Sequence, residues 1–125
     1  MASVLIIDDS MFMRNKLSAV LKTRGHEIVE AEDGIKGLQA ARTRHFDVVL
    51  LDIIMPGTDG LKILGLMREQ LPQTPVIIVT ADIQESVYRQ CMELGATAVI
   101  HKLPKGEELL LAVDNALDPE KGAAR

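Results

Sequence analysis

The sequence is poor in several residue types that mark particular classes of protein. Its 125 residues include one cysteine, no tryptophan, one tyrosine and two phenylalanines. A lone Cys91 cannot form an internal disulfide, which argues against a small disulfide-stabilised secreted domain and fits a reducing cytosol. We expect Cys91 to pack in the core, and we expect that core to consist mainly of Ile, Leu, Val and Met because aromatic side chains are so few.

Long apolar runs and basic stripes are missing as well. The longest apolar runs stop at Asp8 and Asp52, far short of the roughly 20 residues that cross a bilayer. The first residues lack the basic region of a secretory signal, so we expect a cytoplasmic protein without a membrane partner. The net charge is -4, and no Lys/Arg stripe is present, which argues against direct binding of nucleic acid.

The residues that are present suffice for one globular domain. Hydrophobic residues make up 47% of the chain and charged residues 26%, an ordinary balance for a soluble domain and an unusual one for a disordered chain. We expect a single domain over residues 1–118, followed by a short tail at 119–125 whose residue types resemble a frayed end or the start of a linker.

Strand-like and helix-like segments alternate along the chain. Uninterrupted apolar runs indicate strands covered on both faces, and apolar residues spaced three or four apart indicate amphipathic helices. The first helix, for example, has apolar residues at Phe12, Met13, Leu17, Val20 and Leu21. Strands are expected at 4–7, 27–31, 46–52, 75–80 and 98–102. Helices are expected from Ser10 to Gly25, from Asp33 to about 42, from about 60 to before Pro72, at about 83–94 and at 107–117.

This alternation predicts the fold class. Five strands separated by five helices give a doubly wound parallel sheet, because parallel neighbours need right-handed helical crossovers. The second strand, 27–31, alternates between polar and apolar residues, which is typical of a more exposed edge strand.

Polar residues stand at the carboxyl ends of four strands. Asp8 and Asp9 follow the first strand, Asp52 ends the third, Thr80 the fourth and Lys102 the fifth. Each has a simpler interpretation alone: an acid before a helix often only caps it, a strand-end threonine usually packs, and a single lysine is usually solvated. Open α/β sheets bind ligands at the carboxyl ends of their strands. The presence of polar residues at four such strand ends therefore favours a shared site.

The chemistry of such a site follows from its charges. Two carboxylates about 5 Å apart repel each other by roughly 3 kcal/mol at an effective dielectric constant near 20, so three of them need protons, a cation or a lysine. Oxygen ligands favour Mg²⁺ (or Mn²⁺), which keeps several waters and leaves room for a phosphoryl oxygen. A carboxylate can attack phosphorus to form an acyl phosphate, with the metal ion and Lys102 offsetting charge on the transferred group. The Thr80 hydroxyl can donate to that group and draw its loop inward.

These motifs resemble the receiver domain of two-component response regulators, of the CheY-like type. The resemblance covers about Val4 to Leu117 and is carried by VLIIDDS at 4–10, LDIIMPGTDG at 51–60, VIIVTA at 76–81 and LGA at 94–96. It implies a flavodoxin-like sheet with strand order 2-1-3-4-5, in which the four polar strand ends are neighbours.

The resemblance also implies a role for each of these residues. Asp52 would accept a phosphoryl group from a sensor histidine kinase or a phosphotransfer protein. Asp9, Asp52 and the backbone carbonyl of Ile54 would hold Mg²⁺, with Asp8 acting directly or through water. Thr80 and Lys102 would contact the phosphoryl group.

The resemblance further implies a signalling phosphoacceptor with no external substrate, so that any effect would pass through a downstream target protein. That partner would bind the face formed by the fourth helix, the fifth strand and the fifth helix. We expect a monomer or a weak dimer.

Two departures from the family's pattern affect the switch. Leu103 follows Lys102 where the family usually has proline, so we predict a trans peptide bond there, because a cis bond to a non-proline residue costs about 2.5–4 kcal/mol. Val99 stands where an aromatic residue that moves on activation is common, so the readout must rely on the Thr80 loop and the fourth helix.

A third departure affects how fast the phosphoryl group is lost. Ile54, two residues after the acceptor, is apolar where a polar side chain is common, and it cannot orient an attacking water. This predicts slow self-dephosphorylation, with Asp82, two residues after Thr80, partly restoring that role.

Two other functions stay open at this point. A pseudo-receiver would present the same face without being phosphorylated, although the complete set of acids, Thr80 and Lys102 counts against it. A phosphatase of the haloacid-dehalogenase type would also use an aspartyl nucleophile, but those enzymes need a second aspartate two residues on, where Ile54 stands.

Overall fold

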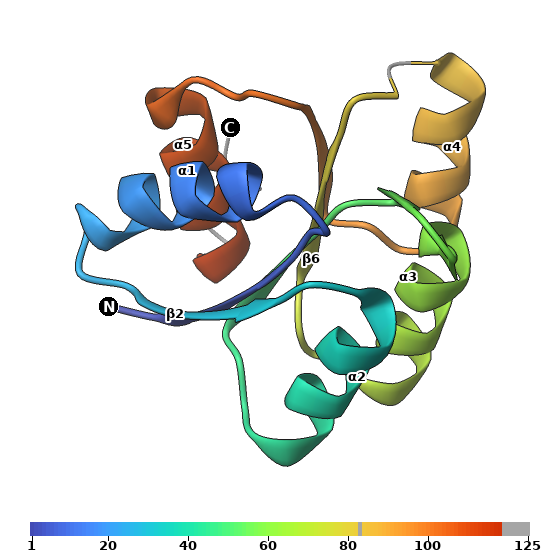
Figure 1. The fold of residues 1–125 in the computed structure, drawn as a ribbon, viewed down its shortest axis with the longest axis horizontal. Helices are drawn as coiled ribbons and strands as arrows, with labels where there is room; N and C mark the ends of the chain where they lie inside the picture. Colours follow the sequence, from blue (N-terminus) through green and yellow to red (C-terminus); the bar gives the residue numbers. More distant parts are fainter. Residues whose placement is uncertain (83, 119–125) are drawn as a thin grey trace.

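The chain folds around one parallel sheet, seen in a computed structural model that describes residues 1–82 and 84–118 (Figure 1). Its order is β2-β1-β3-β6-β7, and a two-stranded antiparallel hairpin, β4-β5, is separate from it. The strands of the sheet are β1 (Ser3–Ile7), β2 (Glu27–Ala31), β3 (Val48–Leu51), β6 (Val76–Thr80) and β7 (Ala98–His101). The doubly wound fold and its 2-1-3-4-5 order are thus confirmed, since β6 and β7 are the fourth and fifth strands of the sheet.

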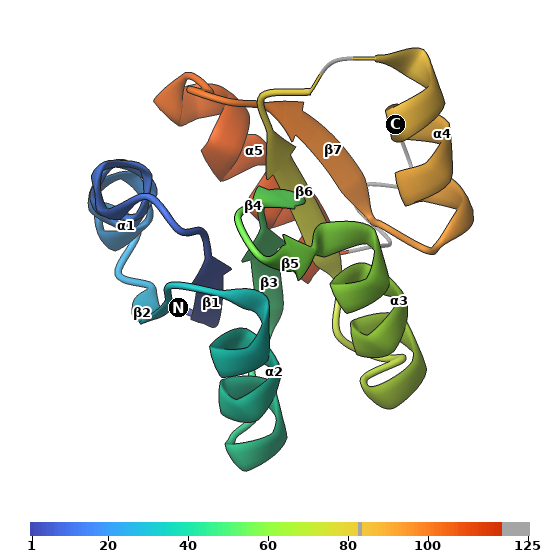
Figure 2. The same ribbon diagram turned by 45° about the vertical axis from the view of Figure 1, so that its right-hand side comes forward.

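Helices cover both faces of the sheet in the described residues. They are α1 (Met11–Lys22), α2 (Gly34–Thr43), α3 (Gly60–Gln70), α4 (Glu85–Glu93) and α5 (Gly106–Leu117). Helices α1 and α5 lie on one face, and α2, α3 and α4 lie on the other (Figures 1 and 2).

The burial of the central strands on both faces explains why their sequences do not alternate between polar and apolar residues. In β1, Val4 and Ile6 pack toward α1 and α5, while Leu5 and Ile7 pack toward the opposite helices. All four are fully buried. A strand buried on both faces needs apolar residues at every position, which the uninterrupted run supplies. Edge strand β2 is more exposed, as its alternation predicts.

Short polar side chains begin three of the helices. Ser10 accepts a hydrogen bond from the Met13 amide at the start of α1, and Asp33 accepts one from the Lys36 amide at the start of α2. Asp59 accepts from two amides at the start of α3. These contacts satisfy amides that the first turn of a helix leaves without partners, which fixes where each helix begins.

Several sequence predictions about individual residues can be compared with the structure. Cys91 is fully buried, as predicted. Every peptide bond among the described residues is trans, including the bond between Lys102 and Leu103. Helix α4 begins at Glu85, whereas the prediction started it at about Ile83, which lies outside the described residues, as does the tail at 119–125.

Phe12 lies in α1 but not on its buried side. Its spacing in the sequence groups it with the apolar residues of α1, but its side chain is 61% exposed. Met13, Leu17 and Leu21 face the sheet instead. Phe12 precedes Met13 by one residue, about 100° around the helix, which turns it away from that stripe.

None of the helices within residues 1–82 and 84–118 is both long enough and apolar enough to cross a membrane.

Candidate functional site

Three carboxylates meet where β1 and β3 end. Asp8 and Asp9 follow β1, Asp52 follows β3, and the parallel pairing of Ile7 with Leu51 brings the two strand ends level. One carboxylate oxygen from each acid lies within 4.8 Å of the other two. Asp8 and Asp52 are each 1% exposed, whereas Asp9 faces solvent. Acids from two separate motifs thus form one cluster with a solvent-facing side.

Lys102 reaches into this cluster from β7. Its Nζ lies 2.8 Å from Asp52 Oδ2 and 3.1 Å from Asp8 Oδ2. Its backbone amide donates to the Thr80 carbonyl at 2.7 Å, which continues the pairing of β6 with β7 past the last residue of the strand. The sheet therefore places this ammonium group between two buried carboxylates.

Asp52 is held on both of its carboxylate oxygens. Oδ2 accepts from Lys102, and Oδ1 accepts from the Ile54 amide at 3.0 Å. Burial raises the pKa of the Asp52 carboxyl group, and the hydrogen bonds from Lys102 and Ile54 oppose that rise without cancelling it. Burial alone would lower the pKa of Lys102, but Asp52 and Asp8 outweigh it and leave that pKa raised, so Lys102 stays a cation.

Asp8 retains one acceptor that a cation can use. Its Oδ1 accepts from the Ser10 amide at 2.9 Å. Its Oδ2 is buried and pairs electrostatically with Lys102, but no hydrogen bond to it is formed by the described residues. Three acids beside a single ammonium leave an excess of negative charge that favours a further cation.

The donor set fits a divalent metal ion. Mg²⁺ binds oxygen at about 2.0–2.1 Å, so two oxygens of one Mg²⁺ ion lie at most about 4.2 Å apart. The three carboxylate oxygens, spread over 4.8 Å, need only a small closure to meet this limit. Oxygen-only ligands with one exposed side suit Mg²⁺ (or Mn²⁺) and leave coordination positions for water. The carbonyl of Ile54 remains a predicted ligand.

Thr80 lies at the neighbouring strand end. Its side chain is buried, and its Oγ1 accepts from the Asp82 amide at 3.2 Å, which leaves the hydroxyl hydrogen available for donation. The Asp82 carboxylate accepts from the Gln84 amide at 3.0 Å, just before α4. Val99 is half-buried and shares a hollow of about 180 Å³ with Thr80 and Tyr88.

The side chain of Ile54 is 51% exposed, on the short strand β4 (Ile54–Met55), which pairs with β5 (Thr58–Asp59). Sequence reasoning missed this hairpin. It also missed Arg14, whose guanidinium group contacts the carbonyl of Asp8. A cation among the apolar residues of α1 was the only signal for Arg14.

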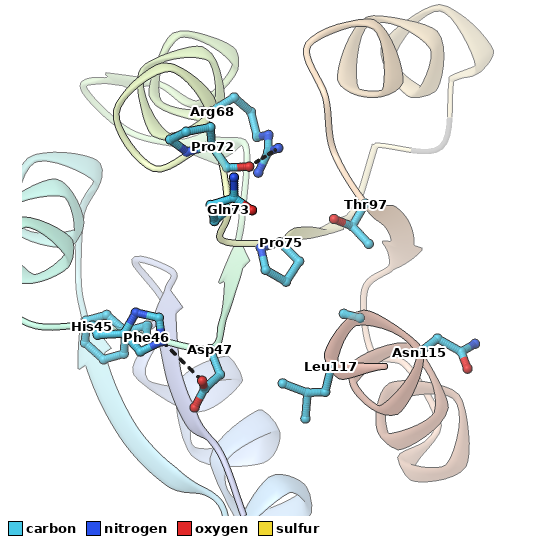
Figure 3. A pocket seen from close by; sticks show the side chains of 11 residues that line it. His45, Phe46, Asp47, Arg68, Pro72, Gln73, Pro75, Thr97, Asn115 and Leu117 are labelled. Atoms are coloured by element: carbon cyan, nitrogen blue, oxygen red, sulfur yellow. Dashed lines mark hydrogen bonds and ion pairs between the residues drawn. The ribbon is translucent and has the colours of Figure 1, made fainter. Parts of the chain in front are cut away.

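A large hollow of about 660 Å³ lies at the opposite end of the sheet (Figure 3). Its lining includes residues that precede β3, β6 and β7, and it contains none of the predicted site residues. Its charged groups have partners: Arg68 donates to the carbonyls of Pro72 and Thr74, and His45 lies 3.3 Å from Asp47. This hollow is therefore not the candidate site.

Comparisons with known proteins identify the family. The model of the response regulator receiver domain matches residues 4–114. The chain belongs to this family. It is therefore a receiver domain of two-component signalling.

Individual relatives agree with this assignment. Protein PilH of Pseudomonas aeruginosa is 40% identical over 119 residues, covering 94% of this chain and 98% of PilH. The structure of the chemotaxis protein CheY4 of Vibrio cholerae matches with a TM-score of 0.87 and 31% identity, covering 94% of this chain and 99% of CheY4.

Other relatives of this receiver domain are longer proteins. The transcriptional regulatory protein ResD of Bacillus subtilis is 34% identical over 110 residues, which is 88% of this chain. The chain spans only 45% of ResD, so what such a longer protein does as a whole is not carried over.

Proposed function

We propose that Asp52 is the phosphoacceptor of a two-component phosphorelay and that its phosphorylation switches the binding of a partner protein. The phosphoryl group would come from a phosphohistidine on a sensor histidine kinase or a phosphotransfer protein. The observation that carries this proposal is the buried Asp52 carboxylate, 2.8 Å from the Lys102 ammonium group and within 4.8 Å of Asp8 and Asp9.

The transfer is a displacement at phosphorus. An oxygen of Asp52 forms the new P–O bond while the P–N bond to histidine breaks, and the imidazole keeps that electron pair and takes up a proton. Lys102 remains beside the acceptor and offsets negative charge on the phosphoryl oxygens. Asp8, Asp9, Asp52 and the Ile54 carbonyl would hold Mg²⁺ (or Mn²⁺), which supplies further positive charge when bound. The buried position of Asp52 limits access of water to the product.

The readout would begin at Thr80. Its hydroxyl hydrogen can turn toward a phosphoryl oxygen on Asp52, which would shift the segment that leads to α4. Because Val99 replaces the usual aromatic residue, the neighbouring Tyr88 and the hollow it shares with Thr80 are the features that such a shift would change first.

A target protein would bind the face formed by α4, β7 and α5. Hollows of about 180 Å³ and 350 Å³ lie on this face beside β7. Tyr88 from α4 and Leu111 from α5 are each 48% exposed. Exposed apolar side chains beside shallow hollows are typical of protein-binding surfaces.

The proposal extends to the setting of the domain. The receiver domain would comprise residues 1–118, followed by a short tail at 119–125. It would work in the cytoplasm, where histidine kinases present their phosphohistidines. It would act as a monomer or weak dimer and as a phosphoacceptor only, without an external substrate.

The test is phosphorylation by a small phosphoramidate, followed by mass measurement of the intact protein. With Mg²⁺ the chain should gain one phosphoryl group, and with EDTA it should gain almost none. No gain with Mg²⁺ would favour the phosphorylation-independent module. In parallel, sustained turnover of a chromogenic phosphomonoester would favour the phosphatase, and we expect none.

A further inference from the structure

Arg14 is largely buried beside the acid cluster. Its side chain is only 11% exposed. Nη1 donates to the backbone carbonyl of Asp8 at 2.7 Å, and Nε donates to Glu30 Oε1 on β2 at 3.1 Å. One guanidinium group thus connects α1 with the end of β1 and with the neighbouring strand.

We propose that Arg14 is a positioning residue for the cation site: it fixes the peptide between Asp8 and Asp9, and through it the exposed carboxylate of Asp9. This inference rests on the proposed function, because it concerns the affinity of the same site for Mg²⁺. It gives a role to a residue outside the acid cluster that is not itself a metal ligand.

The turn after β1 shows why this peptide needs a partner. The ladder between β1 and its neighbours ends at Ile7. Beyond it, the Asp8 amide donates to the Ala31 carbonyl at 3.1 Å, and Asp8 Oδ1 accepts from the Ser10 amide. These two contacts use the amide and the side chain of Asp8, and Arg14 donates the hydrogen bond to the Asp8 carbonyl.

Asp9 depends on this peptide more than the other two acids do. Asp8 and Asp52 are buried and held by hydrogen bonds to their carboxylates. Asp9 is exposed, so its side chain is directed mainly by the backbone on which it stands. Rotation of the Asp8–Asp9 peptide would carry the Asp9 carboxylate away from the other two.

Arginine suits this task better than lysine. Its planar guanidinium group presents donors in fixed directions and can bond a carbonyl and a carboxylate at once, whereas an ammonium group is a compact point charge. The Glu30 carboxylate balances the positive charge, so Arg14 does not simply add a cation that would repel Mg²⁺. Partners outside the ligand set typically change metal affinity by about 10- to 100-fold when they are removed.

The experiment compares Arg14→Met, Arg14→Lys and the parent by calorimetric titration with Mg²⁺. Arg24→Met is the matched control, since Arg24 forms an exposed ion pair with Asp114 far from the acids. We expect about tenfold weaker Mg²⁺ binding for Arg14→Met, an intermediate loss for Arg14→Lys and parental binding for Arg24→Met.

Two further readouts separate positioning from general damage. Without metal, the backbone amide resonances of Asp9 and Ser10 should move in Arg14→Met and not in Arg24→Met. The Mg²⁺ concentration that gives half-maximal phosphorylation should rise by about tenfold in Arg14→Met and stay at the parental value in Arg24→Met.

Parental Mg²⁺ affinity in Arg14→Met would overturn the positioning role and leave the proposed function standing. A parent that binds no Mg²⁺ would overturn both. Should Arg14→Met fail to fold, Arg14→Lys decides the matter: weaker Mg²⁺ binding supports the role, and parental binding overturns it.

Discussion

At the scale of single residues, Asp52 combines a charge with nearly complete burial. Burial raises the pKa of its carboxyl group above the ordinary value of 3.8, despite the opposing Lys102 and Ile54 hydrogen bonds. When folding raises the pKa of an acid, the protein loses stability as the pH rises from the unfolded-state pKa to the folded-state pKa of that acid. Above the folded-state pKa the loss is complete and stays constant. The buried Asp52 carboxylate therefore destabilises the metal-free fold at pH values above the ordinary pKa of 3.8. Such a charge is typical of a functional site.

This predicts that Asp52→Asn stabilises the metal-free protein. Asparagine keeps the size of the side chain and removes the buried charge, while Lys102 keeps its ion pair with Asp8. In EDTA at pH 7, thermal denaturation followed by circular dichroism should show a melting temperature a few degrees above that of the parent. The control Asp33→Asn, at an exposed helix cap, should have the same melting temperature as the parent. A variant at Asp52 that melts below the parent would contradict this interpretation.

Ile54 is expected to set the lifetime of the phosphorylated state. Its amide donates to Asp52, so its side chain stands beside the acceptor but is apolar and exposed. Ile54→Asn should speed loss of the phosphoryl group roughly tenfold, less than the about 10²-fold or more of a full general base. The measurement is the decay of the phosphorylated protein by intact mass, with Ile35→Asn, an exposed isoleucine on α2, as the control. Equal rates of phosphoryl loss in Ile54→Asn and the parent would show that Ile54 does not set the lifetime of the phosphorylated state.

At the scale of secondary-structure elements, the loop after β3 depends on close packing at Gly60. A Cβ atom at this position would lie 2.2 Å from Ile53 Cα and 2.3 Å from the Ile53 carbonyl oxygen. The start of α3 thus presses directly on the backbone that leads to Ile54. Only glycine allows this close approach. The contact between Gly60 and Ile53 keeps the neighbouring Ile54 amide in a position from which it donates to Asp52.

We therefore predict that Gly60→Ala destabilises the protein and disturbs the site. The free energy of unfolding should fall by about 1–3 kcal/mol, since the clash is with backbone and cannot be relieved by a rotamer change. Gly65→Ala on the same helix is the matched control: the nearest atom to its Cβ is 3.9 Å away, and alanine favours the helix by up to about 1 kcal/mol. Urea denaturation measures both. Equal stabilities for the two variants would contradict the close approach at Gly60.

The elements also show what the sequence could and could not predict. Strands such as Val4–Ile7 were predictable because burial on both faces requires an uninterrupted apolar run. The meeting of Asp8 with Asp52 was predictable because parallel strands end at one edge of the sheet. The β4-β5 hairpin was not, since two residues per strand show no periodicity. Contacts such as those of Arg14 depend on how α1 approaches β2, which a local pattern does not encode.

At the scale of the whole molecule, one buried histidine couples stability to pH. His26 is 8% exposed, and its Nδ1 accepts from the Ala2 amide at 3.0 Å, which joins the start of β1 to the start of β2. Burial first, and then the N-terminal charge, lower the pKa of His26 from 6.5. The unfolded chain therefore takes up a proton before the folded chain does as the pH falls.

This predicts that the contribution of His26 to stability is lost in mildly acidic solution. The contribution of neutral His26 is fully present above pH 6.5 and is lost as the pH falls from 6.5 through the lower folded-state pKa. Urea denaturation between pH 7.5 and about 5 should show that the parent loses stability relative to His26→Gln as the pH falls, because Asp52 titrates equally in both proteins and only the parent loses the His26 contribution. His45→Gln, at a highly exposed histidine, should keep the parental profile. Parallel profiles for His26→Gln and the parent would exclude His26 as the cause.

The acceptor role of Asp52 is tested most directly by locating the phosphoryl group. The parent, Asp52→Asn and Asp59→Asn, which changes an exposed acid at the α3 cap, are incubated with a small phosphoramidate and Mg²⁺ and weighed intact by mass spectrometry. We predict one added phosphoryl group on the parent and on Asp59→Asn, and none on Asp52→Asn. A gain on Asp52→Asn equal to that of the parent would contradict the assignment.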